Sequence, residues 1–159
     1  MDLDGYEFSR ASAINADRDA NGSLVLDVPH QRFANLRGLP LNANGLGPFI
    51  RVRVAGLPPR PGVYAVVRGP NEVLYIGRAQ DSIAARWGAT GYAVIYPRNC
   101  FRGGQSTNCR INNLIRLELE NGAELSLWTY TTPECVAMER QLIARLQPAW
   151  NLQGRLNQT

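Results

Sequence analysis

The sequence contains no lysine and a single histidine, His30, so all 17 of its Lys and Arg residues are arginines. The absence of lysine excludes P-loop phosphate binding, Schiff-base enzymes and serine–lysine hydrolases, because each of these needs a lysine amine. One histidine is too few for a His-Glu-x-x-His zinc site or a multi-histidine iron centre. Any catalysis therefore depends on carboxylate, tyrosine, arginine, serine or cysteine side chains.

Cysteine and long apolar segments are also scarce. The three cysteines, Cys100, Cys109 and Cys135, form no Cys-x-x-Cys pair and have no neighbouring histidine, a pattern that predicts reduced thiols and no metal–thiolate site. The acidic N-terminus gives no sign of a signal peptide, and no segment approaches the roughly 20 apolar residues that a membrane helix needs. We therefore expect a cytoplasmic protein that does not contact a membrane.

The positive charge is concentrated in the middle of the chain. Residues 51–116 contain ten arginines and two acidic residues, a net charge of +8, whereas the flanking segments each have a net charge of −2. Guanidinium groups bind phosphate bidentately and displace counterions, so this segment predicts contact with nucleic acid. The alternative is that the arginines only make the surface more hydrophilic.

Turn residues and hydrophobic periodicity predict an α+β fold from Gly62 onward. We expect strands at 63–68, 73–76 and 125–130, of which the first two form a β-hairpin, and a short helix capped by Asp81. Two longer helices are expected, one from about residue 106 to Asn121-Gly122 and one from Thr132-Pro133 to about residue 146. Residues 1–60 contain short strand-like segments at 24–28 and 49–54, and the proline-rich run 58–61 predicts a domain boundary there.

Tyr64 and Tyr75 lie in the two strands of the predicted hairpin. In a symmetric register about Gly69-Pro70, the two tyrosines are directly opposite on one face of the sheet, with Cβ atoms roughly 5 Å apart. Two adjacent phenols suggest a chemical site, although a cross-strand aromatic pair that only packs gives the same pattern.

Glu139 is the most informative single residue because it interrupts an apolar helical stripe of Val136, Leu142, Ile143 and Leu146. A carboxylate in such a stripe must be paired, protonated or bound to a cation, since an isolated buried charge is very unfavourable. The alternative is a position at the edge of the stripe, where the carboxylate reaches water or an arginine.

Five short motifs, in this order, resemble the GIY-YIG nuclease superfamily and its restriction-endonuclease-like members over roughly residues 60–155. They are Gly62-Val63-Tyr64, Leu74-Tyr75-Ile76-Gly77, Arg86, Glu139 and Pro148-Ala149-Trp150-Asn151. Val63 departs from the isoleucine that is usual in the first motif. The resemblance implies an α+β nuclease domain at residues 61–159, with a small antiparallel three-stranded central sheet flanked by helices. Residues 1–60 are then an N-terminal extension that recognises DNA or forms a dimer.

The resemblance also implies a function, a divalent-metal-dependent DNA endonuclease that hydrolyses phosphodiester bonds. Its implied catalytic residues are Tyr64, Tyr75, Arg86, Glu139 and Asn151, with Glu139 as the ligand of one Mg²⁺ or Mn²⁺ ion per active site. We expect restriction-type cleavage of double-stranded DNA, for which a homodimer is one route because one site cuts one strand. The additional DNA contacts expected in the basic segment are Arg78, Arg98, Arg102 and Arg110.

Two alternatives stay open. One is a structure-specific or repair nuclease of the same superfamily, and the other is a non-catalytic nucleic-acid-binding module with the same fold.

Overall fold

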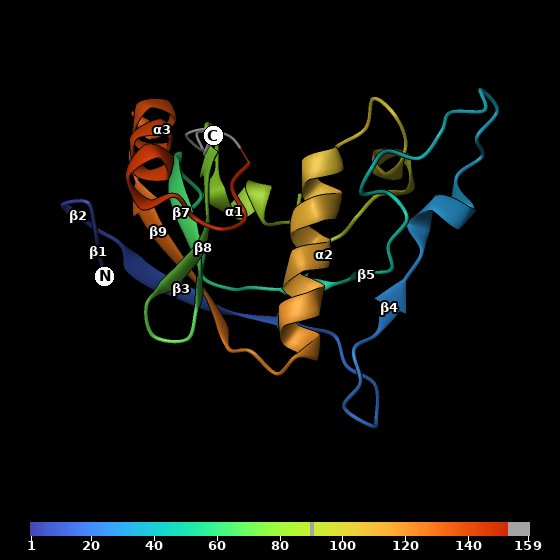
Figure 1. Ribbon diagram of the computed structural model, residues 1–159, viewed down its shortest axis with the longest axis horizontal. Helices are drawn as coiled ribbons and strands as arrows, with labels where there is room; N and C mark the ends of the chain where they lie inside the picture. The colour runs from blue at the N-terminus through green and yellow to red at the C-terminus, as the bar shows by residue number, and fades with distance from the viewer. Residues whose placement is uncertain (90, 153–159) are drawn as a thin grey trace, which may run out of the picture. The chain divides into compact units, whose positions relative to one another are not determined.

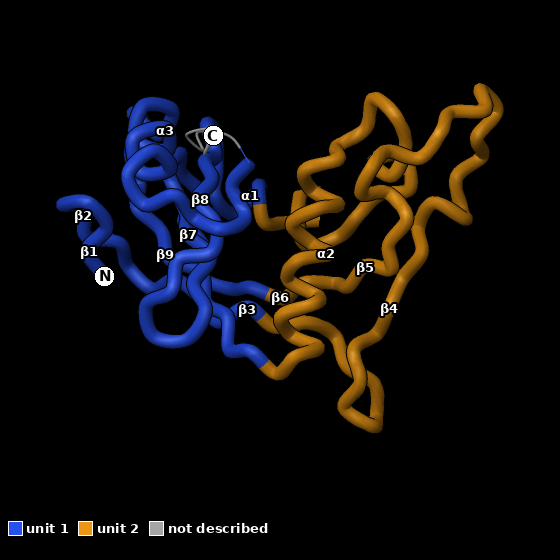
Figure 2. Tube along the Cα trace, in the orientation of Figure 1, with its two compact units in different colours: residues 1–14, 54–86, 123–159 blue, residues 15–53, 87–122 orange. Residues whose placement is uncertain are grey.

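The computed structural model describes residues 1–89 and 91–152 and has an α+β fold. The chain divides into two compact units, each assembled from segments that are separated in the sequence (Figure 2). Unit 1 contains residues 1–14, 54–86 and the described residues from 123 onward, and unit 2 contains residues 15–53 and 87–122. The units cut across the boundary expected near residue 60, and the division into an extension and a nuclease domain stays a prediction.

The main β-sheet is antiparallel, with five strands in the order β6-β3-β9-β7-β8 (Figure 1). Its strands are β3 (Ser9–Ala16), β6 (Val52–Arg53), β7 (Gly62–Arg68), β8 (Glu72–Ala79) and β9 (Leu125–Thr131). The β-hairpin and the later strand expected from the sequence are therefore confirmed as β7, β8 and β9. Strand β7 lies between β8 and β9 and is buried along most of its length, so it forms the centre of unit 1.

The expectation of three strands is wrong, because β3 and β6 come from residues 1–60 and join the same sheet. Strand β6 falls in the strand-like segment 49–54, whereas the sequence predicts no strand where β3 lies. Strand β3 has the sequence SRASAINA, in which Ile14 is the one fully buried residue. Its small and polar side chains conceal the apolar alternation by which strands are recognised. Backbone pairing with β9 defines β3 instead, and its last two residues, which belong to unit 2, pair with β6.

Helix α3 (Cys135–Leu146) packs against β7 and β8 in unit 1. The core between them contains Val63, Ala65, Val67, Ile76, Met138, Leu142 and Ile143. The short hairpin of β1 (Asp2–Leu3) and β2 (Tyr6–Glu7) adds Leu3 and the following Phe8 to the same core. Residues from both ends of the chain thus complete one hydrophobic cluster.

Helix α1 (Ile83–Arg86) is shorter than expected and begins after a different cap. The hydroxyl of Ser82, rather than Asp81, accepts a hydrogen bond from the Ala85 N–H at 3.1 Å. Helix α1 is tied to the proline-rich segment, because the Ile83 N–H donates to the Arg60 carbonyl at 2.9 Å. These bonds fix the start of the helix that ends in Arg86.

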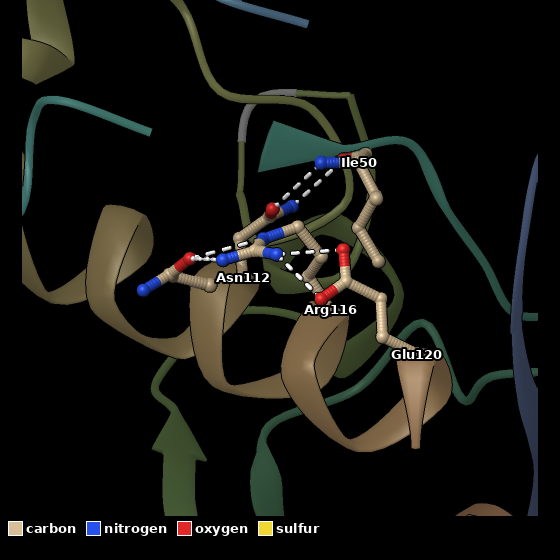
Figure 3. Close-up of polar contacts among 5 residues, drawn as sticks. Ile50, Asn112, Arg116 and Glu120 are labelled. Carbon is tan, nitrogen blue, oxygen red and sulfur yellow. Dashed lines mark hydrogen bonds and ion pairs between the residues drawn. The ribbon is translucent and has the colours of Figure 1, made fainter. Parts of the chain in front are cut away.

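Unit 2 consists of helix α2 (Ser106–Glu120) and a set of loops with little regular structure. The loops include the two-residue strands β4 (Leu26–Asp27) and β5 (Phe49–Ile50) and the 3-10 helices η1 (Pro29–Arg32) and η2 (Pro97–Cys100). Helix α2 ends at Glu120 with Asn121 as its C-cap, and Gly122 follows with a φ of 76°, as the sequence predicts. Figure 3 shows the side chain of Asn112 on α2 bound to the backbone of Ile50 in β5.

All three cysteines are buried. Burial raises the pKa of the Cys100 thiol and raises that of Cys109 to about 12, so neither thiol is a thiolate nucleophile near neutral pH. In residues 1–89 and 91–152, no helix has the length and apolar character needed to cross a bilayer.

Candidate active site

The two tyrosines lie on one face of the β7–β8 hairpin, as the sequence predicts. Their ring centroids are 6.4 Å apart, with an angle of 45° between the ring planes. They are not directly opposite, however, because Tyr64 pairs with Gly77 and Tyr75 pairs with Val66. Two features shift the register from the symmetric one: Arg68 pairs with Glu72, which leaves a three-residue turn, and a β-bulge lies beside Val66. Together they make the two phenols diagonal neighbours on one face.

Gly77 makes this arrangement of the tyrosines possible. A Cβ atom at Gly77 would lie 2.6 Å from the Tyr64 hydroxyl and 2.7 Å from its ring carbons. The phenol of Tyr64 therefore lies directly over the Gly77 backbone, where a side chain on β8 would displace it. The glycine of the second motif is thus explained by the tyrosine of the first.

Glu139 lies on α3, on the helix face that packs against the sheet. The buried residues of that face are Cys135, Met138, Leu142 and Ile143, whereas Val136 and Leu146 are 38% and 39% exposed. The predicted stripe is therefore wrong at Val136 and Leu146, because the contact surface is rotated toward Met138. Glu139 follows Met138 directly, and its side chain is 15% exposed.

The sequence leaves open whether the Glu139 carboxylate is paired, protonated or bound to a cation, and in the structure it is paired with an arginine. The carboxylate accepts a hydrogen bond from the guanidinium of Arg78 on β8, and the two groups form an ion pair. Burial raises the pKa of Glu139 above its usual value, while the positive charges of Arg78 and Arg86 act in the opposite direction. Arg86, the last residue of α1, therefore lies within electrostatic range of the carboxylate.

Asn151 binds the backbone on the outer edge of β8. Its amide oxygen accepts from the Ile76 N–H at 2.9 Å, and its amide nitrogen donates to the Ile76 carbonyl at 2.8 Å. The Trp150 N–H donates to the Leu74 carbonyl at 2.8 Å, so this segment holds the residues on both sides of Tyr75. Asn151 therefore positions strand β8, and both polar atoms of its amide have backbone partners without any ligand.

Unit 1 thus holds all five expected catalytic residues, in two sets that share the edge strand β8. The tyrosines occupy one face of the hairpin, and Glu139 meets Arg78 on the α3 side, since Arg78 follows Gly77 and alternate residues point to opposite faces. The sequence gives no signal for the pairing of Arg78 with Glu139, because the two residues are 61 positions apart.

The other expected DNA contacts lie in unit 2. Arg98 is in η2 and donates to the Arg102 carbonyl at 3.1 Å, and both side chains are exposed. Arg110 is half-buried on α2. These arginines therefore belong to a different compact unit from the tyrosines and Glu139.

The described residues fit a metal ion only as a single-carboxylate site. They contain no group of three or more His, Cys, Asp or Glu side chains that could hold an ion together. Among the described residues of the site, Glu139 is the one acidic side chain. One of its two carboxylate oxygens accepts the hydrogen bond from Arg78. Such a donor set suits an ion that takes one protein oxygen and completes its shell with water and substrate oxygens.

One curated protein is similar to this chain, and the similarity supports the GIY-YIG nuclease superfamily without supporting its restriction-endonuclease-like members. That protein is the UvrABC system protein C of Chelativorans sp. (strain BNC1), to which 103 residues of this chain are 34% identical. The match covers 65% of this chain and 14% of the relative, so the chain corresponds to a small part of that protein. No protein-family model matches the chain. No solved structure matches it either.

Proposed function

We propose that this chain is a DNA endonuclease of the GIY-YIG type that hydrolyses phosphodiester bonds with the aid of a divalent metal ion. The placement of Glu139 is the observation that supports the proposal most. Its shielded carboxylate lies beside Arg78 and within electrostatic range of Arg86, at the strand that also contains Tyr75. The similarity to UvrABC system protein C also favours a nuclease domain that acts on DNA.

Each residue has a separate task in this proposal. Arg86 neutralises the negative charge that develops on the phosphate oxygens. Arg78 favours the ionised carboxylate of Glu139 and so opposes the effect of burial, which raises the pKa of that group. The tyrosines and Glu139 lie on opposite faces of β8, so in this proposal the phosphate lies across the edge of that strand. There Tyr64 takes a proton from the attacking water, and Tyr75 donates a hydrogen bond to the phosphate. Both phenols are buried, with Tyr64 1% and Tyr75 8% exposed. The variants Tyr64→Phe and Tyr75→Phe each remove one hydroxyl, and the pH dependence of cleavage by each variant shows which phenol accepts the proton.

Glu139 is the residue that would hold one Mg²⁺ or Mn²⁺ ion. When bound, such an ion supplies positive charge that stabilises the leaving 3′ oxygen. Arg78 already binds one oxygen of the carboxylate, so the ion and Arg78 would share Glu139.

The substitution Glu139→Gln tests the nuclease proposal, with Glu134→Gln as the matched control on the exposed N-terminal end of the same helix. We expect Glu139→Gln to lower Mg²⁺-dependent cleavage by about 10²-fold to 10⁴-fold while DNA binding is kept. Glu134→Gln should cleave at the wild-type rate. A wild-type protein that binds DNA and cleaves none with Mg²⁺ or Mn²⁺ would instead be a non-catalytic binding module.

The kind of DNA that is cleaved is a separate question. Restriction-type cleavage of duplex DNA, by a homodimer or by two successive nicks, follows from the motif resemblance. The similarity to UvrABC system protein C favours the second candidate, a structure-specific or repair nuclease. Duplex, single-stranded, forked and lesion-containing substrates of one sequence separate the two, because a repair enzyme prefers the altered structures and a restriction enzyme prefers intact duplex.

A further inference from the structure

Unit 2 contains a pocket that none of the roles above uses. Its volume is about 280 Å³, and the segment 33–39 forms its wall together with Arg98. Apolar lining comes from Phe33, Leu36 and Leu39, and positive charge comes from Arg37 and Arg98. A cavity of this size holds roughly nine water molecules, which is more than enough volume for one flat nucleobase.

The pocket wall is held in shape by side-chain hydrogen bonds. The amide of Asn35 donates to the Leu39 carbonyl and accepts from the Leu39 N–H, both at 2.8 Å, which closes the loop on itself. The ring of Phe33 packs on that of Phe101, with centroids 4.9 Å apart. The loop is thus preorganised, which lowers the entropic cost of binding a ligand.

Leu36 lies at the tip of this loop and is 96% exposed. When a partner covers an apolar side chain that is held in water beside a preformed pocket, the free energy of the complex is lowered. The next residue, Arg37, is also exposed. An apolar surface and a guanidinium are therefore presented side by side.

The charge around the pocket suits a polyanion. Within unit 2, the sequence has no acidic residue from 28 to 53 or from 87 to 117, the segments that contain the lining residues of the pocket. Arg32 pairs with Asp27 and Arg53 pairs with Asp17 in the same unit. Arg37, Arg98 and Arg102, in contrast, form no ion pair within residues 1–89 and 91–152. Their guanidinium groups are available for phosphate.

We propose that this pocket binds one unpaired nucleobase of a DNA strand, with Phe33, Leu36 and Leu39 against the base and Arg37 and Arg98 on the adjacent phosphates. This inference rests on the proposed function, since it takes DNA as the substrate. It adds a substrate class, DNA in which a base has left the duplex stack. Contacts of a base with aromatic side chains provide the stacking free energy, and the arginines provide a salt-dependent contribution.

The test compares the affinity of the full-length wild-type protein for two labelled duplexes, one fully paired and one with a single bulged adenine, by fluorescence anisotropy in EDTA. EDTA prevents cleavage, so binding is measured alone. We expect the bulged duplex to bind about five-fold to 100-fold more tightly, the range that one stacked base provides. Equal affinities for the two duplexes would overturn the inference.

Two exposed substitutions assign the preference to the pocket. Leu36→Ser should remove the preference for the bulged duplex, whereas Arg37→Gln should weaken binding to both duplexes and lower the salt dependence. The matched controls are Leu46→Ser, at a leucine that is 67% exposed in the same unit, and Arg145→Gln on the exposed surface of α3. A loss of preference in Leu46→Ser equal to that in Leu36→Ser would also overturn the assignment.

Free deoxyadenosine monophosphate serves as a competitor that identifies the source of the base. Displacement of the bulged duplex at micromolar monophosphate would assign the pocket to free nucleotides and contradict a DNA role, and no displacement supports it. The result is separable from that for the nuclease site. Cleavage without preference for the bulge contradicts only the pocket, and preference without cleavage in Mg²⁺ contradicts only the nuclease proposal.

Discussion

Two buried asparagines, one in each unit, hold a strand in the same way and in different surroundings. Asn151 in unit 1 accepts from the N–H and donates to the carbonyl of Ile76, at 2.9 and 2.8 Å. Asn112 in unit 2 does the same to Ile50, at 3.0 and 2.9 Å, and also donates to the Tyr92 carbonyl at 2.9 Å (Figure 3). The surrounding structure differs, because β8 pairs with β7 from Glu72 to Ala79 apart from one β-bulge, whereas β5 is a two-residue strand.

The difference shows how each unit is held together. Unit 1 depends on regular backbone pairing around β7, to which Asn151 adds an outer edge. Unit 2 depends on side-chain amides that bind loop backbone, and Asn42, which donates to the Asn99 carbonyl at 2.7 Å, is a further example. Loss of one amide is therefore expected to be more damaging in unit 2 than in unit 1.

Asn112→Leu should produce the largest effect. The leucine leaves the Ile50 N–H, the Ile50 carbonyl and the Tyr92 carbonyl without this hydrogen-bond partner. Each buried polar group that loses its hydrogen bond costs about 1–3 kcal/mol. We expect the free energy of unfolding to fall by at least about 3 kcal/mol in a urea titration. Asn113→Ala is the control on the next position of α2, and it should cost less than about 1 kcal/mol. Equal losses in the two variants would contradict the role of Asn112.

Asn151→Ala should have the second largest effect, about 2 kcal/mol, because two bonds to Ile76 are lost and the ladder with β7 remains. Hydrogen exchange of the Ile76 amide is the direct measurement, and its protection should fall more than that of β7. Asn71→Ala, at the exposed turn of the same hairpin, is the control. A cost for Asn151→Ala larger than that for Asn112→Leu would reverse the comparison between the units.

The sequence predicts much of unit 1 and, in unit 2, chiefly helix α2, for a physical reason. Strands β7 and β9 and helix α2 have side-chain periods and capping residues that are local in the chain. The β-bulge that offsets Tyr64 from Tyr75 and the pairing of Arg78 with Glu139 depend on contacts that are distant in the chain. Unit 2 is built from such contacts, so its loops and the role of Asn112 were beyond prediction from local pattern.

The pH dependence of Glu139 should be smaller than either asparagine effect. Burial raises the pKa of this carboxyl in the folded chain above its ordinary value of 4.5, so the folded state binds the proton more tightly than the unfolded state. The stabilisation that this proton gives is present at low pH and is lost as pH rises through the raised pKa. The free energy of unfolding of the wild type should therefore fall relative to that of Glu139→Gln over this window.

Urea titrations of the two proteins between about pH 4 and about pH 8 measure this difference, with Glu134→Gln as the control that keeps the wild-type profile. Asp17 and Glu72, whose pKa values are lowered by hydrogen bonds from Arg53 and Arg68, act at lower pH and are common to all three proteins. A difference that grows in favour of the wild type as pH rises would mean that the ion pair with Arg78 outweighs burial.

Glu120→Gln should have the smallest effect, although Arg116 and Glu120 form a close ion pair on α2, with nitrogen–oxygen distances of 2.6 and 2.7 Å (Figure 3). An arginine placed before a glutamate at i,i+4 is the weaker orientation, and Glu120 ends the helix, where the dipole disfavours negative charge. Arg116 also keeps its bonds to Asn113. We expect a loss of about 0.2–0.5 kcal/mol that disappears in molar salt. A loss comparable to that of Asn112→Leu would mean that surface charge, and not buried amides, holds unit 2 together.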